Sequence, residues 1–237
     1  MAYIRNTFQV VALLAFVLVL SSCKARKTAP EFKGPDTDTE QPKEEEWASV
    51  EKRGKVKIVA SPELPRVVFS TARGNIMLEL FEDKTPNTTA NMIYIIEKEM
   101  YKGSKFHRVE PGPAPRMRII QGGGQTGSSP FDWQIKNEGR LTTYMGLKNS
   151  AGTVAMARTS DPNSGSNQFY ININDHLYLD RQVHPYCVFG KVVGGMDAVK
   201  AVKAGDDFLD TWVVQKRDHK YIPTVSRDKG RTYAPAE

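Results

Sequence analysis

The chain has 237 residues, a length that suits one medium-sized domain with tails better than two full domains. Hydrophobic residues make up 40% and charged residues 25% of it, which is the composition of a globular protein able to build a core without disulfides or metals. The net charge of +6 is spread along the chain without a nucleic-acid recognition motif, so we expect a solvated basic surface and no nucleic-acid partner.

The N-terminus predicts a signal peptide over residues 1–22. Arg5 precedes an apolar run at 8–20, which is shorter than a comfortable membrane span. The run ends in LSSC at 20–23, which resembles the lipobox of bacterial lipoproteins. That resemblance implies cleavage before Cys23 and acylation (palmitate) of its thiol, so that the membrane becomes a partner of the protein. A plain secretory signal or an uncleaved anchor helix is the alternative.

The lipobox also predicts where the protein resides. We expect a lipid-anchored protein of the cell envelope, facing the periplasm or the cell surface. Lys24, rather than aspartate, follows the cysteine, which favours the outer membrane over the inner one. With Cys23 acylated, Cys187 has no disulfide partner, and its apolar context YCVFGKV predicts a small buried hydrophobic residue.

Residues 23–64 are polar and rich in proline, so they cannot bury enough apolar surface to offset their chain entropy. We interpret them as a flexible tether, with room for a short helix and a strand at 47–60. The folded domain is predicted over residues 65–205. Residues 206–237 are predicted to be a C-terminal extension in which the segment FLDTWVV packs.

Alternating hydrophobicity predicts a hairpin, with strands at 67–71 and 76–81 around the turn RGN. Apolar residues at helical spacing predict a helix within 84–101. Short strands are expected to follow among loops rich in glycine, asparagine and proline; they span 106–109, 154–157, 168–173 and 188–193. A strand-rich order with few helices indicates a closed antiparallel barrel.

Four collinear segments then resemble one family. They are TARGNIMLELFEDKTPNTTANM, FHRVEPG followed by QGGG, GTVAMARTSDPNSGSNQFYININ, and LYLDRQVHPYCVFGKVVGGMDAV. Together, over about residues 67–203, they resemble the cyclophilins. The resemblance implies a mainly β fold, a closed eight-stranded antiparallel barrel capped by two helices. It also implies cis/trans isomerisation of X-Pro peptide bonds in proline-containing polypeptides, without metal or cofactor.

The resemblance also assigns the site. Arg108 occupies the family's catalytic arginine position, and Gln121 the glutamine that supports it. A permanently charged guanidinium suits a reaction that needs a fixed hydrogen-bond donor at the prolyl nitrogen. Residues that match substrate-binding positions are Ile119, Ala157, Arg158, Gln168, Phe169, Tyr170, Tyr178, Leu179 and Tyr186. For the apolar members, above all Phe169, ordinary core packing is the alternative, and at Tyr170 the family usually has Phe.

One departure concerns residues 113–120, where the chain has eight residues and the family usually has three. We expect an altered rim of the proline pocket. Two functions therefore stay open: an active isomerase that assists folding in the cell envelope, and a weakly active module that binds proline-containing segments. A basic lipoprotein that binds polyanions is a third reading, and a monomer is expected.

Overall fold

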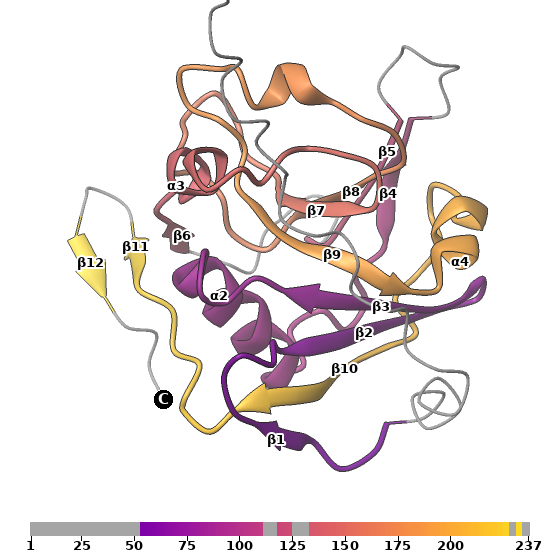
Figure 1. Cartoon of the computed structure of the whole chain (residues 1–237). Helices are drawn as coiled ribbons and strands as arrows, with labels where there is room; N and C mark the ends of the chain where they lie inside the picture. The colour runs from indigo at the N-terminus through magenta and orange to yellow at the C-terminus, as the bar shows by residue number, and fades with distance from the viewer. Residues whose placement is uncertain (1–52, 111–117, 125–132, 228–230, 234–237) are drawn as a thin grey trace, which may run out of the picture. The chain divides into compact units, whose positions relative to one another are not determined.

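The computed structural model describes residues 53–110, 118–124, 133–227 and 231–233. Its main sheet has nine strands in the order β1-β10-β2-β3-β9-β7-β8-β5-β4 (Figure 1). The strands of this sheet, in chain order, are β1 (Lys57–Val59), β2 (Arg66–Thr71), β3 (Gly74–Leu80), β4 (Phe106–Val109), β5 (Ile119–Gly122), β7 (Thr153–Met156), β8 (Phe169–Asn172), β9 (Val188–Gly194) and β10 (Asp210–Arg217).

A second sheet and a few helices complete the described part of the chain. The second sheet has three strands, in the order β12 (Arg231–Tyr233), β11 (Val225–Arg227) and β6 (Trp133–Ile135). The helices are α2 (Pro86–Glu97), α3 (Gly139–Tyr144), α4 (Met196–Ala201) and the single 3-10 turn η1 (Leu177–Leu179). The mainly β class predicted from the sequence is therefore confirmed, and so are the first hairpin, the helix after it and the four later strands.

The prediction of a closed eight-stranded antiparallel barrel is wrong. The sheet has nine strands, and no ladder joins its ends, β1 and β4, within the described residues. An isolated bridge, Lys105 to Asp207, and a few backbone hydrogen bonds around it link the start of β4 to the segment ahead of β10. The sheet is also mixed, because β1 runs parallel to β10. Two helices were expected, and the described residues contain three α-helices, α2, α3 and α4.

Strands from both flanks of the predicted domain explain this difference. β1 lies in the range 23–64 assigned to the tether, and β10 lies in the range 206–237 assigned to the extension. β10 pairs antiparallel with β2 and parallel with β1, so the main sheet continues past the limits 65–205. These domain limits stay a prediction. The signal peptide, Cys23 and most of the tether lie outside the described residues.

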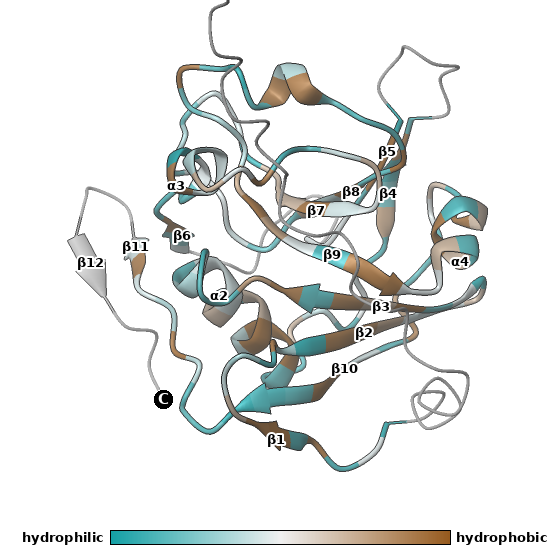
Figure 2. Ribbon diagram, viewed as in Figure 1, coloured by the Kyte–Doolittle hydropathy of each residue, from teal (hydrophilic) through white to brown (hydrophobic). Residues whose placement is uncertain are grey.

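Helix α2 owes its start to local chemistry. Pro86 occupies a first-turn position, where a missing backbone N–H costs nothing. The Glu138 carboxylate accepts hydrogen bonds from the backbone N–H groups of Asn87 (3.2 Å) and Thr88 (2.8 Å). An anion at this end of a helix is favourable, because it satisfies donors that have no intrahelical partner. The helix buries its apolar side chains, and the apolar colour of Figure 2 marks the turns that lie near β10.

Candidate active site

The strand registers bring five residues into one row across the main sheet. Three of them were predicted as site residues from the sequence and two were not. Arg108 on β4 lies opposite Gln121 on β5, Gln121 opposite Tyr170 on β8, and Tyr170 opposite Ala155 on β7. Ala155 lies opposite Val188 on β9. Residues directly opposite one another in antiparallel strands share one face of the sheet. We call these residues, Arg108, Gln121, Tyr170, Ala155 and Val188, the site row.

The neighbouring row faces the other way. It consists of Phe106, Gly122, Phe169 and Met156, which are paired in the same sequence of strands, and we call it the core row. Phe106 and Phe169 are completely buried and their rings meet edge-on, with centroids 6.3 Å apart. Gly122 is required here, because a Cβ atom would lie 2.7 Å from the rings of both Phe106 and Phe208.

A β-bulge in β4 separates Arg108 from the core. Phe106 and Arg108 are two residues apart, so in a regular strand they would point to the same face. However, Phe106 pairs with Gly122 and Arg108 pairs with Gln121, which means that β4 carries one extra residue at His107. Bulges re-aim side chains in this manner, and this one places the Arg108 head group on the same face as Tyr170.

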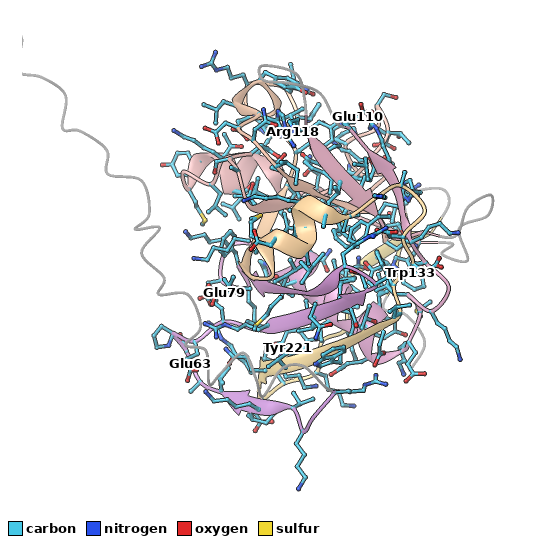
Figure 3. The ribbon with its side chains drawn as sticks, turned by 90° about the vertical axis from the view of Figure 1, so that its right-hand side faces the viewer. Glu63, Glu79, Glu110, Arg118, Trp133 and Tyr221 are labelled. Atoms are coloured by element: carbon cyan, nitrogen blue, oxygen red, sulfur yellow. The ribbon has the colours of Figure 1, made fainter. Side chains whose placement is uncertain are left out.

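Arg108 is held by two side chains. Its Nε donates to Glu110 Oε1 at 2.8 Å, and its Nη1 donates to Gln121 Oε1 at 3.4 Å, a long and weak contact. Gln121 Nε2 in turn donates to Gln168 Oε1 at 3.0 Å. The side chain of Arg108 remains 46% exposed, so the cation is oriented by protein and also open to a ligand. Figure 3 places Glu110 beside Arg118, where β4 ends and β5 begins.

An apolar cluster lies next to this polar chain on the same face. Its buried members, which we call the site cluster, are Ile119, Leu147, Ala155, Tyr170, Leu179 and Val188, edged by the partly buried Phe81, Ala157 and Tyr186. Five of the predicted substrate-binding residues therefore meet in one place: Ile119, Ala157, Tyr170, Leu179 and Tyr186. Ala157 is anchored there through its backbone N–H, which donates to the carbonyl of Gln168 at 2.9 Å.

Aromatic and cationic contacts shape the edge of the site cluster. The rings of Tyr170 and Tyr186 meet edge-on, with centroids 5.9 Å apart. The Arg158 guanidinium lies over the Tyr186 ring at 4.1 Å, within the range of a cation–π contact. Arg158 also donates to the carbonyls of Thr159 and His184. The side chain of Arg158 thus holds Tyr186 in place.

Two tyrosine hydroxyls of the site stay protonated over a wide pH range. Burial raises the pKa of Tyr170 well above its ordinary value. Burial also raises the pKa of the more exposed Tyr178, with a further increase from Tyr186 and an opposing decrease from the positive charge of Arg108. Tyr178, which is 53% exposed on η1, is therefore electrostatically coupled to the catalytic candidate.

One predicted residue is not brought to the site. Phe169 lies in the main core, where its ring contacts Phe69, Tyr101, Phe106 and Phe208. The Phe169 ring thus packs in the core, as in the alternative that the sequence left open, because neighbouring residues of β8 point to opposite faces. Residues 111–117, which include most of the inserted segment, lie outside the described residues. Cys187 is buried and unpaired as predicted, and burial raises its pKa to about 12.

Sequence reasoning missed several neighbours of the site. The sequence did offer a signal for Glu110, because it stands two residues after Arg108, directly past the end of β4. Leu147 and Asn149 had no such signal, since they reach the site from the segment between α3 and β7.

Among the described residues, no cluster of histidine, cysteine or carboxylate side chains could hold a metal ion. Within those same ranges no helix has the length and hydrophobicity needed to cross a membrane.

Comparisons with known proteins identify the family. The profile of the family described as "Cyclophilin type peptidyl-prolyl cis-trans isomerase/CLD" matches residues 66–220. A peptidyl-prolyl cis-trans isomerase of Acinetobacter baylyi is 39% identical over 143 residues, which cover 57% of this chain and 70% of that protein. Peptidyl-prolyl cis-trans isomerase B of Escherichia coli is 40% identical over 145 residues, covering 58% and 83%.

Solved structures show the same fold. A cyclophilin from Hirschia baltica has a TM-score of 0.54 at 23% identity, covering 65% of this chain and 74% of that one. A cyclophilin type peptidyl-prolyl cis-trans isomerase of Cryptosporidium parvum has a TM-score of 0.53 at 24% identity, covering 63% and 97%. With a family match across most of the described chain and relatives near 40% identity, the chain belongs to the cyclophilin-type peptidyl-prolyl cis-trans isomerases.

Proposed function

We propose that this cyclophilin catalyses cis/trans isomerisation of X-Pro bonds in polypeptides of the cell envelope, with Arg108 as its catalytic residue. The observation that carries the proposal is the site row, which puts an oriented, half-exposed guanidinium on the same face as the site cluster. X-Pro isomerisation takes tens to hundreds of seconds without a catalyst, so it limits the folding of many proteins.

The chemistry requires no bond to break. Rotation about a peptide bond meets a barrier of about 20 kcal/mol, because the C–N bond has partial double-bond character. In the twisted transition state the prolyl nitrogen regains a lone pair, which can accept a hydrogen bond. A guanidinium that donates to this lone pair binds the twisted form better than the planar one, and such differential binding lowers the barrier.

Each remaining residue has a role in holding the substrate. The proline ring rests against the edge of the site cluster, near Leu179 and Tyr186. Gln121 orients Arg108 through its Oε1 and is itself held by Gln168. The backbone of Ala157 and Arg158 binds the substrate chain in an extended conformation, and the exposed Tyr178 covers the residues beside the proline.

A proteolysis-coupled assay on an Ala-Pro tetrapeptide tests the proposal. Wild-type protein is expected to accelerate the cis-to-trans step, and Arg108→Ala to lose that acceleration while still binding the peptide. Arg108→Lys keeps the charge but not the planar donor fork, so it restores only part of the rate. If the wild-type protein binds the peptide but does not accelerate the step, the proposal that it is an active isomerase is refuted.

Anchoring through lipid on Cys23 completes the proposal and places the domain at a membrane of the envelope, with the outer membrane favoured. Its support is the LSSC segment at 20–23. The expected outcome is partition of the full chain into the detergent phase with an acyl mass on Cys23, both lost in Cys23→Ser. A Cys187→Ser control keeps the acyl mass.

A second function, a proline-binding module with little turnover, is favoured by one contact. Glu110 accepts a hydrogen bond from Arg108 Nε at 2.8 Å and shares the positive charge that catalysis needs. If this pair restrains the arginine, Glu110→Gln raises kcat/KM at least about fivefold. If the pair only orients Arg108, the same substitution changes kcat/KM less than about twofold.

A further inference from the structure

A buried amide is hydrogen-bonded to the site cluster through the Tyr170 hydroxyl. Asn149 is completely buried in the segment between α3 and β7. Its Oδ1 accepts a hydrogen bond from the Tyr170 hydroxyl at 2.7 Å and a longer one from Asn172 Nδ2 at 3.3 Å. Because burial keeps Tyr170 protonated, its hydroxyl acts as a donor toward this oxygen.

The same residue holds both ends of η1. The backbone N–H and the Nδ2 of Asn149 donate to Asp180 Oδ1 at 3.1 and 2.6 Å, and Asp180 follows η1 directly. The Asn149 carbonyl accepts from the backbone N–H of His176 at 2.6 Å, and His176 directly precedes η1. Asn149 therefore bridges a residue of β8 to a turn that carries Tyr178 and Leu179.

This bridge joins two sides of the site cluster. Tyr170 comes from the sheet and Leu179 from η1, and both are buried members of the cluster. The Tyr170–Asn149–Asp180 chain of hydrogen bonds connects the two sides directly. A buried hydroxyl that lost its acceptor would favour a shifted ring, because unpaired buried polar groups are costly.

We propose that Asn149 is a positioning residue of the isomerase site, which sets the spacing between the Tyr170 ring and Leu179 and so determines how well a proline ring fits. The inference rests on the proposed function. It assigns Asn149 an effect on substrate binding rather than on the rotation step, since its hydrogen bonds go to Tyr170 and to the two ends of η1, whereas Arg108 is held by Glu110 and Gln121.

A double-mutant cycle on kcat and KM tests the inference. Asn149→Ala is expected to raise KM about tenfold with kcat changed less than twofold, because the loss is of uniform binding. Tyr170→Phe removes only the hydroxyl and raises KM about threefold, and it adds nothing further in the Asn149→Ala background because the two groups act as one unit. Asp180→Asn keeps one acceptor oxygen and should fall between wild type and Asn149→Ala.

The matched control is Asn91→Ala, another completely buried amide, whose partners are Trp133 and the carbonyl of Ser166. It should lower the urea midpoint without raising KM. Additive KM effects of Asn149→Ala and Tyr170→Phe, or an equal KM increase in the control, would overturn the inference. If Asn149→Ala does not fold, Tyr170→Phe and Asp180→Asn form the cycle. Wild-type acceleration that disappears in Arg108→Ala must be seen first, and its absence refutes the proposed function instead.

Discussion

The core row and the site row run side by side across the same strands, yet their side chains differ in kind. The core row contains rings and a glycine that pack without polar partners, as at Phe106, Gly122 and Phe169. The site row contains a cation, an amide and a phenol, Arg108, Gln121 and Tyr170, each of which has a side-chain hydrogen-bond partner. One row contributes stability by burial, and the other holds functional groups in fixed orientations.

This difference shows how one sheet can supply both a stable core and a functional site. Alternation along β5 and β8 separates the two rows at no cost, because successive residues point to opposite faces. β4 does not follow simple alternation, and only its bulge at His107 moves Arg108 out of line with Phe106. Substitutions in the core row should therefore change stability, and substitutions at the exposed end of the site row should change catalysis.

The largest expected effect is on stability. Phe169→Ala removes a ring that contacts four other aromatic side chains, so we expect a loss of about 3–5 kcal/mol in the free energy of unfolding. Tyr170→Phe, one residue further on, keeps its ring and should lose less than about 2 kcal/mol. Urea denaturation of both variants measures the difference. Equal losses would contradict the division between the rows.

A smaller effect is expected at Glu138, which belongs to neither row. Glu138→Ala removes the acceptor for the backbone N–H groups of Asn87 and Thr88, and we expect a loss of about 1–2 kcal/mol. Glu138→Gln keeps an acceptor oxygen and should lose less, which separates the hydrogen bonds from the charge. Urea midpoints test this, and an unchanged midpoint for Glu138→Ala would show that the contact does not stabilise α2.

Sequence patterns predicted much of this arrangement. The strands carrying Arg108 and Tyr170 and the helix α2 follow from short-range patterns in the sequence, whereas Gln121 is identified only by the family motif and its strand was not predicted. The β1–β10 pairing does not follow from them, because it joins segments from opposite ends of the domain. Asn149 is equally hidden, because its partners Tyr170 and Asp180 are 21 and 31 residues away. Register and long-range hydrogen bonds are set by the assembled sheet and loops.

The smallest expected effect is on the pH dependence of the free energy of unfolding. The Asp83 carboxylate accepts hydrogen bonds from Arg217, which holds its pKa below the ordinary value of 3.8. A lowered folded-state pKa means that the ionised carboxylate stabilises the fold above the unfolded pKa, and this contribution is lost as pH falls through the folded pKa. The Asp83 side chain is more than half exposed, and the mostly buried Arg217 keeps a second ion pair with Glu82, so Asp83→Asn should cost under about 1 kcal/mol at pH 7.

Urea denaturation at pH 7 and in acid checks the sign. The difference between wild type and Asp83→Asn should shrink as the pH falls below the ordinary pKa of the aspartate. A difference that grows in acid would show that the carboxylate is not stabilised by Arg217. Because Asp83 lies outside both rows, kcat/KM at pH 7 should remain within about twofold of wild type.

The most direct test of the central claim measures catalysis and stability together in Arg108→Ala. The account predicts that kcat/KM for an Ala-Pro tetrapeptide falls at least about 100-fold, because a transition-state donor is lost. It also predicts that the free energy of unfolding stays within about 0.5 kcal/mol, because the side chain is half exposed and takes part in a surface ion pair. An active Arg108→Ala protein, or one that is inactive only because it has unfolded, would contradict the account.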